Sequence, residues 1–349
     1  MERLLYGLTQ AARVGWFGAH YALARRLSTS AEERRRGARS APGLRLALRR
    51  DLIALFRRDL ANIEAGHYRM PHDLIPNPLQ RIEGSVRFFS DLPSVDRRRR
   101  AGTADEPFRS RRRGEALPRY YLQNFHFQSG GWLSRESAAV YDTQVEVLFT
   151  GAADAMRRQC LVPLGQVLGP PARRRDARSS GKGLRLLDVG CGTGRLLSYV
   201  MDSWPGLAAV GLDLSQPYLD HAAKLLASWP GVELHRGLAE KMPFADETFD
   251  AVTCVFLFHE LPRKVRKQVA FEIGRVLKPG GRLVLVDSLQ TGDKPLYDPL
   301  LAAFPKTFHE PYYGDYTRTD LAALFDAAGL HHVSTSQAFL SKVVVFDKV

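Results

Sequence analysis

The spacing of hydrophobic positions changes partway along the chain. Apolar residues recur at helical spacing in residues 1–27 and 44–65, and again from Ser134 to about Gln159. After residue 183, short continuous apolar runs alternate with helix-like segments. Continuous apolar runs are typical of strands buried on both faces of a parallel sheet. The pattern therefore predicts a mostly helical N-terminal region and a C-terminal α/β domain.

The α/β domain is predicted over residues 184–349, after a Gly-, Pro- and Arg-rich linker at 169–183. Strands are expected at residues 184–189, in a short segment that ends at Asp213, at 232–235, at 251–258 and at 282–286, with a terminal pair at 332–336 and 342–346. Helices are expected at 218–227, 263–277 and 320–328. Alternating strands and helices imply a parallel sheet with right-handed crossovers. In the N-terminal region, residues 1–168, the Arg-rich stretch 92–118 is predicted to be a mobile excursion.

The most informative stretch runs over residues 184–198, where an apolar strand passes through three alternating glycines into a helix. Bare backbone and the free N–H groups of a helix N-terminus let a ligand approach closely. Asp188 ends this strand, and Asp213 ends the next strand, where a carboxylate can accept hydrogen bonds from ribose hydroxyls. A dinucleotide site would need Gly or Ala at the position of Arg195, so the spacing disfavours a pyrophosphate ligand.

This glycine loop and Asp213 resemble the first motif and the ribose-binding acid of class I S-adenosylmethionine-dependent methyltransferases. Segments 240–250, 251–258 and 276–286 match, in order, the family's loop before the fourth strand, that strand, and the turn and fifth strand. The chain is most similar to the ubiquinone/menaquinone-biosynthesis C-methyltransferases of the type 11 group. The resemblance implies a Rossmann-like, doubly wound seven-stranded sheet whose last strand is antiparallel, an enzyme that catalyses methylation, and S-adenosyl-L-methionine as cofactor.

The resemblance also implies the cofactor site. Ala139 to Asp142 resembles an Ala-x-Tyr-Asp motif in the helices that cover the cofactor as a lid. At Leu238 many relatives carry Asp or Asn, and losing that hydrogen bond to the adenine costs about 0.5–1.5 kcal/mol. The predicted cofactor-binding residues are Asp188, Gly190, Cys191, Gly192, Gly194, Asp213, Leu214, Leu238, Ala239, Glu240, Phe256 and Tyr141.

Two aromatic groups are candidates for the substrate pocket, although packing against the main domain or a surface loop explains them nearly as well. One lies before the Ser134 helix and the other follows the fifth strand; they comprise Tyr121, Phe125, Trp132, His309, Tyr312 and Tyr313. If the acceptor must lose a proton, His259 and Glu260, just past the fourth strand, are the first candidates, and His126 is a weaker one. Capping of the next helix is an alternative role for His259. No metal is predicted.

Net charge is +13, with 33 Lys and Arg against 18 Asp and Glu in residues 1–182, and 17 against 19 in the remainder. Such asymmetry can mark a nucleic-acid or membrane surface. Arg outnumbers Lys 40 to 10, however, and the Arg clusters at 34–36, 97–100, 111–113 and 173–175 fall in segments predicted as solvated loops. Three cysteines provide no disulfide framework or metal spacing, which is typical of a cytoplasmic protein.

The helix at residues 1–27 is too polar to span a membrane, and it either docks on the protein's own core or lies on a membrane surface. The leading hypothesis is a methyltransferase of a small lipophilic or aromatic acceptor, such as a quinol, a lipid or a secondary metabolite. The alternatives are an RNA or DNA methyltransferase that uses the basic half, and a non-catalytic protein that binds S-adenosylmethionine. The chain shows no recognisable nucleic-acid-binding module.

Overall fold

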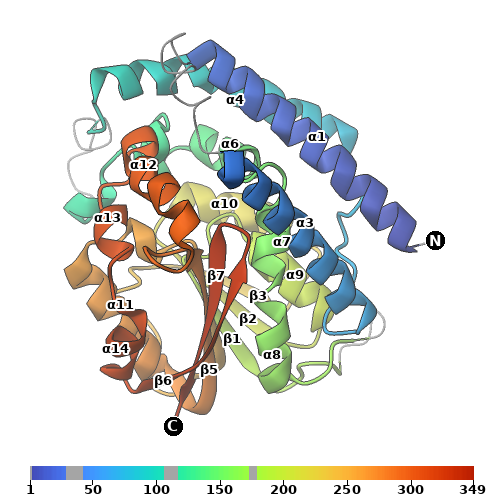
Figure 1. Cartoon of the computed structure of the whole chain (residues 1–349). Coiled ribbons are helices and arrows are strands. Elements are labelled where there is room, and N and C mark those ends of the chain that lie inside the picture. The colour runs from blue at the N-terminus through green and yellow to red at the C-terminus, as the bar shows by residue number, and fades with distance from the viewer. Residues whose placement is uncertain (1, 29–41, 106–116, 173–178) are drawn as a thin grey trace.

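A computed structural model describes residues 2–28, 42–105, 117–172 and 179–349. Within these residues a seven-stranded sheet has the order β3-β2-β1-β4-β5-β7-β6 (Figure 1). The strands are β1 (Arg185–Val189), β2 (Ala208–Asp213), β3 (Val232–Arg236), β4 (Phe249–Val255), β5 (Leu277–Ser288), β6 (Leu330–Ala338) and β7 (Ser341–Lys348).

The first five strands are parallel, and β7 runs antiparallel to both β5 and β6. This confirms the predicted doubly wound sheet with its antiparallel last strand. The strand order reverses between β1 and β4, which are direct neighbours. In open α/β sheets, ligands bind beyond the carboxyl ends of the strands at such a reversal.

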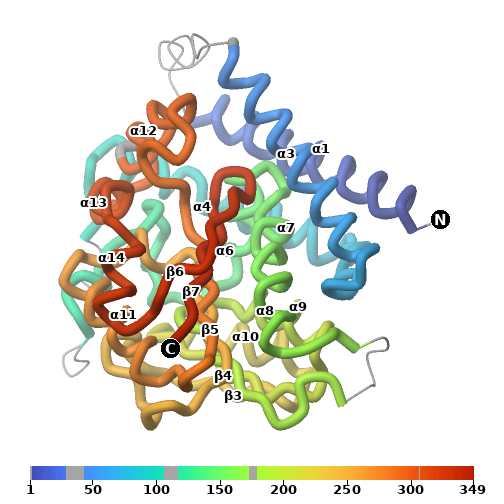
Figure 2. Tube along the Cα trace, turned by 60° about the horizontal axis from the view of Figure 1, so that its bottom comes forward, coloured from blue at the N-terminus to red at the C-terminus, as the bar shows by residue number. Residues whose placement is uncertain are grey.

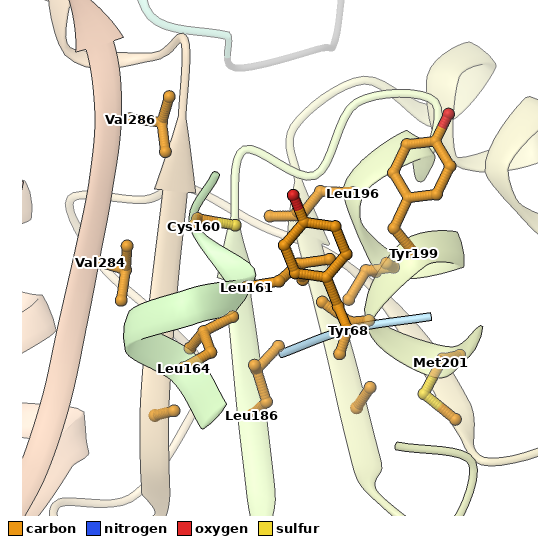
Figure 3. Packing of buried hydrophobic residues seen from close by; sticks show 14 of the residues in the cluster. Tyr68, Cys160, Leu161, Leu164, Leu186, Leu196, Tyr199, Met201, Val284 and Val286 are labelled. Atoms are coloured by element: carbon orange, nitrogen blue, oxygen red, sulfur yellow. The ribbon is translucent and has the colours of Figure 1, made fainter. Parts of the chain in front are cut away.

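Helices cover both faces of the sheet. Leu186 and Leu187 of β1 belong to two different hydrophobic clusters, because successive side chains of a strand point to opposite faces. On one face lie α8 (Leu161–Leu168), α9 (Arg195–Ser203) and α10 (Gln216–Leu225), and on the other α11 (Arg263–Val276) and α14 (Leu321–Asp326). Figure 3 shows Leu161 and Leu164 of α8 packed among strand and helix side chains of the first face.

The N-terminal region forms a helical layer over the carboxyl edge of the sheet and down one side (Figures 1 and 2). Its long helices α1 and α3 lie side by side, and α1 also contacts α4 and α6. The N-terminal helices are α1 (Glu2–Ser28), α3 (Pro42–Glu64), α4 (Pro78–Ala101), α6 (Arg135–Leu148) and α7 (Ala153–Arg158). No helix in the described part of the chain is long and apolar enough to cross a membrane.

Short elements complete the edge of the sheet near the N-terminal layer. Three single-turn helices precede α6, one follows β4, and one precedes α12; they are η1 (Arg119–Tyr121), η2 (Phe125–Phe127), η3 (Gly131–Leu133), η4 (Phe258–Glu260) and η5 (Pro295–Tyr297). Two further helices, α12 (Asp298–Phe308) and α13 (Tyr313–Tyr316), connect β5 to α14. These elements supply most of the polar side chains discussed below.

The predicted helix from Ser134 to Gln159 is in fact broken. Ser134 caps its N-terminus, because its side chain accepts a hydrogen bond of 3.0 Å from the Ser137 N–H. The helix ends at Leu148, and Gly151 turns the chain with φ +83°, a conformation that glycine adopts without strain. The pieces after the turn, α7 and α8, share the core of the sheet, so packing is continuous across the predicted boundary at residue 168.

The prediction of a mobile excursion at 92–118 is wrong for residues 92–101, which form the second half of α4. Arginine is a good helix former, and Arg98 donates a 2.8 Å hydrogen bond from its Nε to a backbone carbonyl of η2, which fixes this end of α4. Gly102, in the left-handed region, ends the helix. Residues 106–116 of the same prediction lie outside the described residues.

A buried ionic network connects the helical layer to the sheet domain. Asp154 of α7 accepts hydrogen bonds from Arg157 at 2.9 Å and from Arg195 of α9 at 2.6 Å, and it also pairs with Arg13 of α1. Arg195 in turn pairs with Asp73 at 2.6 Å. Because Arg195 directly follows the glycine loop, this network attaches the N-terminal layer to the start of α9.

Candidate functional site

The glycine loop lies beyond the carboxyl end of β1, at the point where the strand order reverses. Gly190 and Gly194 have φ of +72° and +79°, so both need the conformational freedom of glycine. Asp213, at the end of β2, accepts hydrogen bonds from the Gly192 N–H at 2.9 Å and the Ser215 N–H at 2.8 Å. These two bonds fix the carboxylate next to the loop. Burial raises the pKa of Asp213 above its usual range.

A pocket opens at this point, here called the glycine-loop pocket, with a volume of about 100 Å³. Nine of the twelve predicted cofactor-binding residues line it: Gly190, Gly192, Asp213, Leu214, Leu238, Ala239, Glu240, Phe256 and Tyr141. The remaining three, Asp188, Cys191 and Gly194, lie outside its lining. Asp188 and Cys191 are buried, and burial raises the pKa of Asp188 to about 7 although the Thr253 hydroxyl donates to its carboxylate at 2.7 Å.

Aromatic side chains from the N-terminal region and from α10 close one side of the glycine-loop pocket. Tyr121, Trp132, Tyr141 and Tyr218 all line it. The Trp132 ring stands edge-on to Tyr141 and to Tyr218, with centroids 5.6 and 5.5 Å apart. Edge-to-face packing of this kind favours a well-defined wall. The side chain of Tyr120 hydrogen-bonds Glu240 at 2.6 Å across the pocket, which joins η1 to the loop after β3.

The helix that carries Tyr141 is also attached to the glycine loop. The Thr193 hydroxyl donates a 2.9 Å hydrogen bond to the carboxylate of Asp142. Ala139 to Asp142 is the segment that resembles the family's lid motif, and this contact places it directly over the loop. Tyr141 and Asp142 therefore fix α6 at the pocket from two neighbouring positions.

The catalytic candidates lie together at one end of the pocket. Glu260 lines it, and one side-chain atom each of Glu260, His126 and Glu310 lies within 4.8 Å of the others. We call these three residues the His–Glu cluster. Burial and the neighbouring Glu310 charge raise the pKa of Glu260 well above its usual range. His126 has φ +53°, a strained conformation for a residue other than glycine.

His259 stands behind Glu260 and is held by Asp287, whose carboxylate lies 2.6 Å from Nδ1. Burial by itself would lower the pKa of His259, but the charge and hydrogen bond of Asp287 outweigh it and raise the pKa to about 10. The imidazole is therefore protonated at neutral pH. A protonated imidazole cannot accept a proton as the predicted general base would, and its Nε2 lies 3.9 Å from the Glu260 carboxyl group.

The residues predicted for a substrate pocket are separated by the fold. Tyr121 and Trp132 line the glycine-loop pocket, whereas Phe125 is buried behind it and stacks on Trp132 at 5.7 Å. His309 and Tyr312 line a separate surface hollow. Tyr313 is buried with its hydroxyl 2.6 Å from that of Ser288. Tyr312 packs against the aromatic cluster that contains Trp132, and the Tyr313 ring stands edge-on to His259, so both residues support the site without lining the glycine-loop pocket.

Sequence reasoning missed a second cavity of about 230 Å³, here called the helical cavity. It lies among α1, α4, α6 and α12, and its walls are mainly apolar: Tyr21, Ala24, Phe88, Leu92, Val95, Val145, Val147, Leu148 and Phe308. His126 also lines it. The His126 ring lies edge-on to the rings of Trp132 and Phe308, with centroids 5.9 and 6.5 Å apart. His126 therefore lies between the two cavities.

Glu310 and Asp287 are further site residues that the sequence analysis did not select. Asp287 directly follows a buried apolar run at the carboxyl end of β5, and this position could have identified it. Glu310 lies in the predicted aromatic segment after α12, but nothing in its local sequence distinguishes it. It is 1% exposed.

Of the Arg clusters, only that at 97–100 lies among the described residues. Arg98 to Arg100 make bonds within the protein, including ion pairs of Asp96 with Arg99 at 2.9 Å and with Arg100 at 2.7 Å. The clusters at 34–36, 111–113 and 173–175 lie outside the described residues.

Comparisons with known proteins agree with this geometry. Residues 186–281 match the family described as a methyltransferase domain. A demethylmenaquinone methyltransferase of Bacillus licheniformis is 35% identical over 170 residues, which cover 44% of this chain and 72% of that protein. A phosphatidylethanolamine N-methyltransferase of Cereibacter sphaeroides is 34% identical over 148 residues, covering 41% and 70%. An uncharacterized methyltransferase of Synechocystis is 35% identical. That match covers 42% of this chain and 66% of the other protein, just under two thirds of its length.

Among solved structures, a SAM-dependent methyltransferase from Aquifex aeolicus aligns with a TM-score of 0.38 and 21% identity, over 48% of this chain and 84% of that one. Each of these matches takes up less than half of this chain. The family match spans β1 to β5, which carry the glycine loop and Asp213. The chain belongs to the class I S-adenosylmethionine-dependent methyltransferases, is similar to the quinone-biosynthesis enzymes among them, and uses S-adenosylmethionine as its cofactor.

Proposed function

We propose that this enzyme methylates a small lipophilic acceptor, whose apolar part occupies the helical cavity and whose reacting atom lies at the His–Glu cluster. The observation that carries the proposal is the position of His126. It lines the helical cavity, and its imidazole lies within 4.8 Å of Glu260, which lines the glycine-loop pocket. Polar side chains of the His–Glu cluster thus lie between an apolar space and the expected cofactor space.

Methyl transfer from a sulfonium is an in-line displacement, so the protein mainly aligns the reactants and excludes water. The cofactor supplies the electrophilic methyl group. The aromatic wall of Trp132, Tyr141 and Tyr218 suits the exclusion of water, since these rings pack edge to face beside the pocket. In this proposal Glu260 and His126 contact the acceptor's polar end, and protonated His259 positions Glu260.

Two relatives support a lipophilic acceptor. Their names assign them to demethylmenaquinone and to phosphatidylethanolamine, both of which carry long apolar chains. The mainly apolar lining of the helical cavity fits the same class of molecule. Burial of each additional CH₂ group of the acceptor contributes about 0.8 kcal/mol of binding free energy, so kcat/KM should rise about fourfold per CH₂ until the cavity is filled.

The first experiment incubates the purified protein with methyl-labelled S-adenosylmethionine and a host extract, and then separates organic, aqueous and nucleic-acid fractions. We expect label in the organic fraction and none with the Asp213→Ala variant. Label in RNA or DNA would contradict the proposal and favour the alternative of a nucleic-acid methyltransferase. Unlabelled fractions, with cofactor still bound, would favour the non-catalytic alternative.

A second experiment tests the helical cavity itself. Leu92→Trp places a bulky indole ring in the cavity. Val86→Trp places the same ring on the same helix, at a residue that is 60% exposed. We expect Leu92→Trp to raise KM for long-chain acceptors while short-chain acceptors keep theirs, and Val86→Trp to change neither. Equal effects of the two variants would place the acceptor elsewhere.

Peripheral membrane contact is a further proposal, supported by exposed apolar side chains on α1. Leu4, Leu8 and Leu27 are each more than 60% exposed, while Tyr6 and Phe17 are buried against the protein. The C-terminal end of α1 lines the helical cavity, so a lipid surface there would lie close to the proposed acceptor site. Co-sedimentation with phosphatidylglycerol vesicles tests this; binding that Leu4→Ser and Leu8→Ser together leave unchanged would contradict it.

A further inference from the structure

We propose that the His–Glu cluster, His126, Glu260 and Glu310, binds one divalent transition-metal ion between the two cavities. The sequence predicted no metal, because the three ligands come from η2, η4 and the turn after α12, which are far apart in the chain. The proposal concerns a binding site, and it does not depend on the identity of the methyl acceptor.

The arrangement of the donor atoms fits an ion. All three donor atoms lie within 4.8 Å of one another. A metal with bonds of about 2.1 Å holds its ligand atoms roughly 3–4 Å apart, so small side-chain movements would complete the site. One imidazole and two carboxylates suit Mn²⁺, Fe²⁺ or Zn²⁺ better than Mg²⁺ or Ca²⁺, which favour oxygen ligands alone.

Unsatisfied polar atoms provide the second argument. The Glu310 side chain is completely buried, and among the described residues neither of its carboxylate oxygens has a hydrogen-bond partner. His126 Nε2 is likewise without a hydrogen bond, although it lies within ion-pair distance of Glu310 in an orientation that forms none. A buried carboxylate without hydrogen bonds is costly unless a charge compensates it. A metal ion would satisfy all three atoms.

Nearby charges also favour a cation. The side chains of Glu260 and Glu310 bring two carboxyl groups within 4.8 Å of each other. In bonds and ion pairs that the structure shows, both carboxylates meet only histidines, and no Arg or Lys. Two carboxyl groups and one imidazole form a ligand set that suits a divalent transition-metal ion.

The location gives such an ion a role in recognition. Glu260 faces the glycine-loop pocket and His126 faces the helical cavity. An ion held by both residues would bind an oxygen atom of a molecule that enters from the helical cavity. The ligand class it selects is therefore an oxygen-bearing lipophilic molecule.

Mn²⁺ binding to the metal-free full-length protein tests the inference, by electron paramagnetic resonance titration and by isothermal calorimetry, with Zn²⁺ as a second probe. We expect one saturable site per chain, and an affinity that falls at least about 100-fold in Glu310→Gln and in His126→Gln. His332→Gln, which removes an exposed histidine that is hydrogen-bonded to Thr335, is the matched control and should bind Mn²⁺ like the wild type.

Thermal unfolding with and without Mn²⁺ covers the case in which a variant folds poorly. Mn²⁺ should raise the Tm of the wild type and of His332→Gln, but not that of Glu260→Gln, whose side chain lies at the edge of the pocket. Absence of saturable binding, or binding unchanged in all three cluster variants, would overturn the inference and leave His126 and Glu310 as a buried ion pair. Methylation of a lipophilic acceptor by the metal-free protein would reject a need for the ion while leaving the proposed function intact.

Discussion

Replacement of Asp213 by alanine tests the assignment of the cofactor site. The carboxylate is held by backbone N–H groups of Gly192 and Ser215, at 2.9 and 2.8 Å, so its position is set before the cofactor arrives. In the class I family the corresponding acid accepts hydrogen bonds from the ribose hydroxyls. Asp213→Ala should therefore weaken binding of S-adenosylmethionine much more than it weakens the fold.

The size of the effect follows from the bonds that are lost. A hydrogen bond to a charged acceptor contributes about 1.5–3 kcal/mol, and the ribose offers two hydroxyls. Water that enters the space left by the side chain offsets part of this loss, so we expect a net cost of about 3 kcal/mol, or roughly a 150-fold increase in Kd. Asp213→Asn keeps one oxygen acceptor, and its Kd should rise about 10-fold.

Isothermal calorimetry with S-adenosylhomocysteine gives the Kd values, and thermal unfolding without ligand gives the stability. Because burial raises the pKa of Asp213, the fold without cofactor already disfavours the charged form, and Asp213→Asn should leave Tm nearly unchanged. Asp220→Ala is the control, because it removes another acidic side chain near Asp213, on the exposed side of α10. A Kd for Asp213→Ala within about threefold of the wild type would refute the assignment.

Three further predictions concern the scaffold of the site. Gly194→Ala forces a residue other than glycine to φ +79° and brings its Cβ within 2.7 Å of Leu226, so the free energy of unfolding should fall by about 1–3 kcal/mol in urea titrations. The control is Gly280→Ala, whose Cβ meets no neighbouring atom, so this variant should cost only the strain of its φ. Asp154→Ala leaves three buried arginines with one partner fewer, so the free energy of unfolding should fall by about 3–5 kcal/mol. Glu83→Ala, which breaks an exposed pair, should lower it by less than about 1 kcal/mol. Equal losses in the two variants would contradict a stabilising role for the buried network. Asp188 has a pKa of about 7 in the fold and about 3.9 when unfolded, so the wild type should lose stability relative to Asp188→Asn as pH rises from 4 to 7; a difference that is constant with pH would reject the shifted pKa.

Much of the fold could be predicted from the sequence, because the signals involved are local. The apolar runs of β1, β4 and β5 are buried on both faces and therefore carry a continuous hydrophobic pattern. The glycine loop has to turn through positive φ, and this requirement is visible in the residues themselves. Eight of the nine predicted cofactor residues that line the pocket lie at or just after strands whose carboxyl ends meet at one edge, and the ninth, Tyr141, comes from α6.

The N-terminal region was harder to predict, because helix ends and loops depend on tertiary contacts. The Arg-rich end of α4 is ordered by a hydrogen bond to a carbonyl of η2, which no local pattern indicates. The break after α6 falls at Thr150 and Gly151, which both have positive φ, and a Cβ at Gly151 would lie 3.1 Å from Arg13 of α1. A helical hydrophobic pattern continues across Gly151 and does not mark the break, whereas the Arg-rich end of α4 has too few apolar residues to indicate a helix.

The sequence by itself determined the family, the sheet and the cofactor loop of this protein, because each depends on contiguous residues with a characteristic spacing. Only the tertiary structure brought His126, Glu260 and Glu310 together and formed the helical cavity beside them. Those features come from loops and helix faces far apart in the chain, and their side chains converge only when α4, α6 and α12 pack over the edge of the sheet. Long-range packing of this kind leaves no periodic pattern in the sequence, which is why the acceptor side of the site had to be found in the structure.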